Sequence, residues 1–118
     1  PTRPWCPCAP GAAPRRGGSI DAGFPTTTAA ALATLTTGLA AGEHGLTSYS
    51  ALDRENDRVV NLLRGWDDRA RPEQWQPHPT VFERAAARGI EPVVVGAERY
   101  RDTGFTTAVL RGARFEAH

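Results

Sequence analysis

The 118-residue sequence contains no methionine and no lysine, and it has only two cysteines. All fourteen basic residues are therefore arginines. Arginine binds oxyanions through paired hydrogen bonds, which favours phosphate recognition, but GC-rich coding DNA gives the same bias. The formal net charge is +1, so composition provides no field that would attract nucleic acid or a membrane surface. No run of about 18 apolar residues is present, which argues against a membrane-spanning helix.

The two cysteines form a Cys-x-Cys pair, Cys6 and Cys8, in the stretch PWCPCAP. A zinc site would need a second such pair or histidines at a set spacing, and neither follows nearby. A disulfide across one intervening residue would be strained. We therefore expect neither a metal site nor a redox function here.

Residues 1–18 are rich in proline and glycine and have no hydrophobic periodicity, so we expect an irregular, disordered leader. Residues 19–118 are predicted to form one α/β domain. The missing methionine suggests a fragment or a processed chain. No charged start followed by an apolar segment marks a signal peptide, and the predicted location is cytoplasmic.

A first helix is predicted over residues 28–39, where alanines and leucines follow three threonines. Thr26 or Thr27 would cap its free amides. Gly38 and Gly42 would end it. Leucines recur at three- and four-residue intervals and predict one apolar stripe, formed by Leu32, Leu35 and Leu39.

A second helix has the clearest start signal, because Thr80 and Glu83 form a capping box in PTVFERAAARG. Gly89 would stop this helix, and IEPVVVG at 90–96 would follow as a buried strand. A third, shorter helix is predicted to begin in TGFTTAVLRGARF, with Thr103 or Thr106 as its cap.

Between the first two helices we expect a strand in 57–63 and a strand or extended loop in 44–53. Residues 64–79 read as a polar loop punctuated by proline. Its tryptophans, Trp66 and Trp75, would either fix the loop onto the sheet or stack on a nucleotide base. For Arg111 and Arg114 we expect surface charge, with contact to phosphate as the alternative. The other charged and polar side chains of this part of the chain are expected to be solvated: Asp53, Arg54, Glu55, Asp57, Arg58, Asp67, Asp68 and His78.

The three threonines stand where the first helix begins, at the positive end of its dipole. That end of a helix binds phosphate or sulfate through free N–H groups. A threonine there is usually only a cap, but a hydroxyl beside a bound phosphoryl group could also attack it. Such a hydroxyl is a weak nucleophile unless it is activated, for example by zinc.

The stretch FPTTTAAALATLTTGLAAGEHGL resembles the nucleophile region of the nucleotide pyrophosphatase/phosphodiesterase family, within the alkaline phosphatase superfamily. That family has Phe-Pro-Thr-x-Thr, then Thr-Gly-Leu, then His-Gly, and these begin here at Phe24, Thr37 and His44. The intervals from Thr28, nine residues to Thr37 and sixteen to His44, agree with the family spacing. The resemblance extends over about residues 19–118.

The resemblance implies that Thr28 attacks phosphorus and binds one of two zinc ions. The family has an asparagine that contacts the phosphate, and Tyr49 occupies this place, twenty-one residues after Thr28. Its phenol could donate one hydrogen bond to substrate, or it is an ordinary strand aromatic. His44 would form a structural turn. The family binds its two zinc ions through Asp and His residues that have no convincing match here, and Asp21 is too close to Thr28 to be the upstream ligand. Most zinc ligands are therefore absent from this chain.

The implied fold is part of an alkaline phosphatase-like three-layer sandwich, a βαβ-type piece of a larger sheet. The implied function is hydrolysis of phosphate esters or phosphoanhydrides, with a small phosphate ester or nucleotide as substrate and neither nucleic acid nor membrane as partner. The isolated chain is expected to be inactive. The alternatives are a catalytically dead truncated product and a phosphate-binding module without chemistry.

Overall fold

A computed structural model describes residues 21–118 of the chain. The expected leader, with Cys6 and Cys8, lies outside these residues. The described part is a small mixed α/β fold with two separate two-stranded sheets. This confirms the predicted α/β class.

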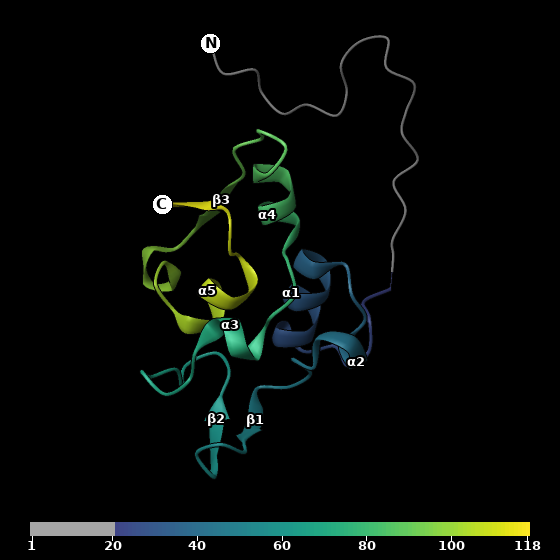
Figure 1. Ribbon diagram of the computed structural model, residues 1–118, viewed down its shortest axis with the longest axis vertical. Helices are drawn as coiled ribbons and strands as arrows, with labels where there is room; N and C mark the ends of the chain where they lie inside the picture. The colour runs from purple at the N-terminus through teal and green to yellow at the C-terminus, as the bar shows by residue number, and fades with distance from the viewer. Residues whose placement is uncertain (1–20) are drawn as a thin grey trace.

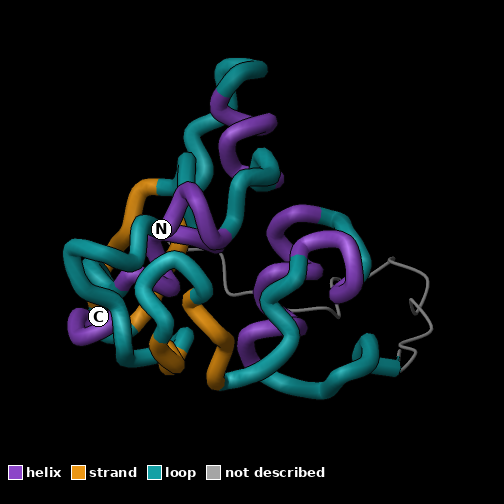
Figure 2. The backbone as a smooth tube through the Cα atoms, turned by 60° about the horizontal axis from the view of Figure 1, so that its bottom comes forward, coloured by secondary structure: helices purple, strands orange, loops and turns teal. Residues whose placement is uncertain are grey.

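The elements are short and follow one another closely. In chain order they are α1 (Thr28–Thr37), α2 (Ala41–His44), β1 (Ser50–Asp53), β2 (Arg58–Asn61), α3 (Pro72–Trp75), α4 (Val81–Ala86), β3 (Val93–Gly96), the 3-10 helix η1 (Glu98–Tyr100), α5 (Gly104–Val109) and β4 (Arg114–Ala117). Figure 2 shows that loops connect all of them and form much of the backbone.

The helices α1, α3 and α5 lie in the middle of the molecule, between the two sheets (Figure 1). The β1–β2 hairpin is antiparallel, with Ala51 opposite Val60, and projects at one end. At the other end β3 runs parallel to β4, with Val94 opposite Phe115. The core lies between the helices and consists of Ala29, Ala33, Leu46, Leu62, Phe105, Ala108 and Val109.

Helix α1 begins and ends at signals that the sequence carries. The Thr27 hydroxyl accepts a hydrogen bond from the Ala30 amide at 3.1 Å, so Thr27 is the N-cap. Gly38 ends the helix in the left-handed conformation, at φ 76°. The predicted end at Leu39 was therefore too late, and Gly42 lies within α2 instead of ending α1.

The predicted leucine stripe of α1 was only partly right: Leu32 packs against the core cluster, and Leu35 does not. Leu35 is 74% exposed, while Ala29, Ala33 and Thr36 are buried. Ala29 and Ala33 join the core cluster together with Ala108 of α5, and small residues allow two helices to approach closely. The alanine face of α1, together with Leu32, therefore faces the core.

Two other helices confirm their predicted caps. Thr80 accepts from the Glu83 amide while Glu83 accepts from the Thr80 amide, which is the predicted capping box of α4. Thr103 caps α5 by accepting from the Thr106 amide at 3.1 Å.

Two predictions for the middle and end of the chain need correction. The predicted loop 64–79 contains helix α3, which begins with a proline at its first position, a place that suits proline. The strand predicted to be buried in 90–96 is partly open: Val93 is 43% exposed and Val95 68% exposed. Its only partner among residues 21–118 is β4, which the sequence analysis did not predict.

Candidate functional site

Thr28 and Tyr49 lie next to each other at the start of α1. Thr28 is the first residue of the helix and is exposed, and Tyr49, just before β1, is 48% exposed. The Thr28 Oγ1 and Tyr49 Oη atoms are 3.5 Å apart. The two residues singled out from the sequence, twenty-one positions apart, therefore present their hydroxyl groups to the same point of the surface.

A single side chain, Thr27, ties the start of α1 to the loop that carries Tyr49. Its hydroxyl accepts from the Ala30 amide and donates to the Thr47 carbonyl at 2.9 Å. Sequence analysis identified Thr27 only as a possible cap. The contact with Thr47 spans twenty residues and has no local signal.

The N-terminal end of α1 carries free donors beside this pair. Within residues 21–118, the amides of Thr28 and Ala29 have no hydrogen-bond acceptor, as expected for the first turn of a helix. With the helix dipole, they favour a negative charge at this point. The surface around Thr28 is therefore suited to an anion such as a phosphoryl group.

A cleft of about 900 Å³ opens beside Thr28, within the usual size range of small-molecule sites. Its walls come from α1, β3, η1, α5 and β4 and include Leu32, Trp66, Tyr100, Phe105, Leu110 and Phe115. Trp66 packs edge-on against Trp75, with ring centroids 6.0 Å apart, and both rings contact the core cluster. The tryptophans therefore fix the loop, as one of the two alternatives predicted, and they fix it onto the helical core instead of onto a sheet.

His44 is buried, with 4% of its surface exposed, and is the last residue of α2, just before the turn at Gly45. Its Nδ1 accepts from the Leu46 amide at 3.1 Å, so in the neutral ring Nε2 carries the proton and donates to Thr34 Oγ1 at 3.0 Å. Burial lowers the pKa of His44, and nearby His78 lowers it further, while Glu43 opposes the shift. These contacts support the expected structural role of His44.

Because the pKa of His44 is lower in the folded chain than in the unfolded chain, acid is expected to destabilise the fold. The unfolded state binds a proton near pH 6.5, and the folded state does so only at lower pH. Stability should therefore be complete above pH 6.5 and fall as the pH decreases below it. Urea unfolding between pH 8 and pH 5 should show this slope, and His44→Asn, which keeps an acceptor for the Leu46 amide, should flatten it. An unchanged slope in this variant would contradict the assignment.

Three of the charged residues expected to be solvated contact one another, while Arg54, Glu55, Asp57 and Asp68 are exposed as expected. Arg58 forms a paired contact with Asp67, at 2.5 and 2.7 Å, and a further one with Asp53 at 3.2 Å. Asp53 is 7% exposed, and hydrogen bonds from Asn56 lower its pKa. The Arg58 hydrogen bonds hold the pKa of Asp67 well below its usual range. Asp53 and Arg58 therefore have a structural role, whereas Asp67 pairs with Arg58 while its side chain stays 42% exposed.

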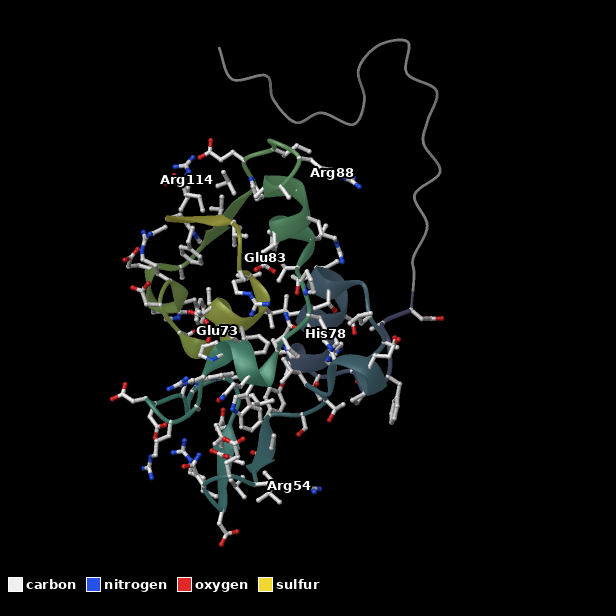
Figure 3. All side chains as sticks on the ribbon, viewed as in Figure 1. Arg54, Glu73, His78, Glu83, Arg88 and Arg114 are labelled. Atoms are coloured by element: carbon white, nitrogen blue, oxygen red, sulfur yellow. The ribbon has the colours of Figure 1, made fainter. Side chains whose placement is uncertain are left out.

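The two arginines considered as phosphate contacts also bind protein groups. Arg111 contacts Glu83 at 3.0 Å and the carbonyls of Gln76 and His78 at 2.9 and 3.0 Å. Arg114 pairs with two glutamates on the surface. His78 is half-buried, not exposed as predicted. Figure 3 shows Arg54 and Arg114 at opposite ends of the molecule, with Glu83 between them in this view.

The residues around Thr28 do not fit a two-zinc site. Across positions 21–118 no three histidine, cysteine, aspartate or glutamate side chains gather closely enough to hold a metal ion. The polar side-chain neighbour of the Thr28 hydroxyl is a tyrosine and not a carboxylate or an imidazole. Thr28 would offer a metal one oxygen only.

Comparison with known families matches residues 16–111 to the family described as Type I phosphodiesterase / nucleotide pyrophosphatase. This match covers most of the chain and includes both Thr28 and Tyr49. The chain belongs to this family. The resemblance identified from the threonine segment is thus confirmed. No curated protein and no solved structure gives a significant match.

Membership of the Type I phosphodiesterase / nucleotide pyrophosphatase family indicates a hydrolase of phosphodiester or pyrophosphate bonds. The family acts on small nucleotide or phosphate ester substrates and is generally metal-dependent. Among residues 21–118, no helix has the length and apolar character needed to cross a membrane.

Proposed function

We propose that this chain is the nucleophile segment of a phosphohydrolase and that Thr28 is the attacking residue. The observation that carries the proposal is the position of the Thr28 hydroxyl, at the free N-terminus of α1 and 3.5 Å from the Tyr49 phenol. Both residues lie within the region matched to the phosphodiesterase family. Either the monoester or the diester class of substrate is compatible with this arrangement.

The proposed reaction transfers a phosphoryl group twice. The Thr28 oxygen forms a bond to phosphorus, and the bond from phosphorus to the leaving oxygen breaks with its electron pair on that oxygen. The proton that Thr28 loses balances the proton that the leaving oxygen gains to depart as an alcohol. Water then cleaves the ester to Thr28 and releases phosphate from a monoester substrate, or a phosphate monoester from a diester. The phenol of Tyr49 would donate a hydrogen bond to a phosphoryl oxygen, and the free amides of α1 would offset the charge on the others.

A metal is assigned no step in this reaction. The described side chains supply no cluster for it, so zinc ligands in an active enzyme would have to come from outside residues 21–118. We therefore propose that the isolated chain has no activity of its own. Tests of catalysis therefore use the protein as its gene encodes it, including any segment that accompanies these residues.

We also propose that β3 and β4 belong to a larger sheet, in an alkaline phosphatase-like three-layer sandwich that includes residues 19–118. Parallel sheets occur almost only where both faces are covered by other elements. The β3–β4 pair is parallel, yet Val93 and Val95 remain 43% and 68% exposed. A larger sheet with further helices would cover these side chains.

A covalent intermediate provides the direct test of Thr28 as the nucleophile. The gene-encoded protein is mixed with a chromogenic phosphodiester, quenched in acid within the first turnovers and digested for mass spectrometry. We expect the peptide that contains Thr28 to carry the phosphoryl group together with the ester group that has not yet left, assigned to that residue by fragmentation. A phosphoryl group on another residue, or its absence during active turnover, would contradict the proposal.

The second candidate is a phosphate-binding module without turnover, favoured by the lack of a metal cluster among the described side chains. The two candidates differ in a simple measurement. If the gene-encoded protein binds inorganic phosphate, and Thr28→Ala weakens this binding, but no ester is cleaved, the module is the correct description.

A further inference from the structure

The Thr27 hydroxyl occupies a key position between the two residues of the proposed site. It caps α1 by accepting from the Ala30 amide at 3.1 Å, and it also donates to the Thr47 carbonyl at 2.9 Å. Thr28 follows it directly in the chain, and Tyr49 follows Thr47 by two residues. One oxygen atom therefore joins the backbone segments that carry both hydroxyl groups.

From this geometry we infer that Thr27 is a positioning residue, which sets the distance and direction between the Thr28 hydroxyl and the Tyr49 phenol. The expected effect on rate rests on the proposed function. The expected effect on the distance between Thr28 and Tyr49 does not. Thr27 itself is only partly exposed, and its hydroxyl is already occupied by both contacts, so it does not need to touch substrate.

The loop that carries Tyr49 has few other ties to α1. Residues 45–49 leave α2 at Gly45, which has a φ of 75°, and enter β1 at Ser50. Leu46 anchors the beginning of this loop in the core. Beyond Leu46, the contact between Thr27 and Thr47 is the hydrogen bond that links the loop to the helix start, apart from the 3.5 Å contact of the site itself.

Removal of the Thr27 hydroxyl should have a modest effect on the stability of the fold and a large effect on the catalytic rate. Loss of an N-cap hydroxyl removes only a small part of the stability of a folded domain. A displacement of about 1 Å between reacting groups can lower a catalytic rate by about 100-fold. Thr27→Val keeps the shape of the side chain and removes its hydroxyl. The protein should therefore still fold, but the Thr28 hydroxyl and the Tyr49 phenol should be displaced from each other.

The chain offers a matched control at α4. The Thr80 hydroxyl also caps a helix, accepting from the Glu83 amide at 3.1 Å, and also donates to a distant carbonyl, that of Arg111 at 2.5 Å. Thr80→Val removes the same two kinds of contact away from Thr28. Thr27→Ser is the rescue variant, because serine retains both functions of the hydroxyl.

The first readout is the nuclear Overhauser effect between the Thr28 methyl group and the Tyr49 ring, which needs no activity. We expect it in the wild type, Thr27→Ser and Thr80→Val, and we expect it to weaken or vanish in Thr27→Val. The second readout is the rate of the gene-encoded protein: Thr27→Val should lower kcat by about 10- to 100-fold with little change in KM.

An Overhauser effect in Thr27→Val equal to that of the wild type would overturn the inference, as would an equal loss of kcat in Thr80→Val. If the effect is lost in Thr27→Val but no variant and no wild-type protein cleaves an ester, the positioning role stands and the proposed function fails. The two proposals can therefore fail separately.

Discussion

Thr28→Ala in the gene-encoded protein is expected to lower kcat/KM for a chromogenic phosphodiester by at least about 1,000-fold. Alanine retains the helix start, since Thr27 and not Thr28 provides the cap of α1. The substitution removes the oxygen that would bond to phosphorus, together with the Cγ2 methyl group. Because that bond exists only in the reaction and not in substrate binding, the loss should fall mainly on kcat.

Two neighbouring variants define what this result means. Thr26→Ala removes an exposed hydroxyl two residues away, which makes no side-chain hydrogen bond within residues 21–118, so its rate should stay close to that of the wild type. Thr28→Ser keeps a hydroxyl and should retain measurable turnover. If Thr28→Ala stays within tenfold of the wild type, Thr28 is a helix residue beside the site and not its nucleophile.

Local signals allowed the sequence to predict helix starts. A threonine hydroxyl bonds to an amide three residues ahead, so the information needed to place Thr27, Thr80 and Thr103 is contained in a few adjacent residues. The left-handed glycine after α1 is equally local. These caps were predicted for a physical reason that does not depend on the rest of the fold.

Burial was predicted poorly, because it depends on the neighbouring element and not on the segment itself. The leucines of α1 have the spacing of a core stripe, yet its alanines enter the core and Leu35 is 74% exposed. The valines of β3 read as a buried strand, but β4 pairs with one edge only. In both cases the hydrophobic pattern of the segment does not show which other element packs against it.

Polar contacts between distant segments were also beyond the sequence. Arg58 and Asp67 are nine residues apart and form a paired contact, whereas each was predicted to be solvated. Arg111 reaches the carbonyls of Gln76 and His78, more than thirty positions away, and thereby fixes the loop before α4. Charge type is visible in a sequence, but the choice of partner is made by the fold.

The candidate site could be predicted in part, because it combines a local sequence signal with a contact between distant segments. The threonine segment identified Thr28 through a family spacing, and the same spacing identified Tyr49. In our inference their 3.5 Å contact depends on the turn at Gly45 and on the hydrogen bond from Thr27 to Thr47. The first is suggested by a glycine, while the second joins a side chain to a backbone carbonyl and has no sequence signature.

Gly112→Ala is expected to destabilise the fold by about 3 kcal/mol, the largest stability effect of a single methyl group that we predict. Gly112 has a φ of 89°, in the left-handed region that alanine avoids. A Cβ atom there would also lie 2.6 Å from the backbone nitrogen of Glu83 and 2.8 Å from its Cα. The contacting atoms belong to the first turn of α4, so they cannot rotate away.

Gly89→Ala separates the two causes. Gly89 has a similar φ of 78°, but a Cβ atom there would meet nothing within 4 Å. It should therefore lose only the conformational part, about 1 kcal/mol. Urea unfolding of both variants measures the difference, and an equal loss would show that α4 yields to the methyl group. A larger loss of stability for the Gly112 variant would show that the turn before β4 packs rigidly against the start of α4. The Arg111–Glu83 ion pair, at 3.0 Å, joins the same two segments.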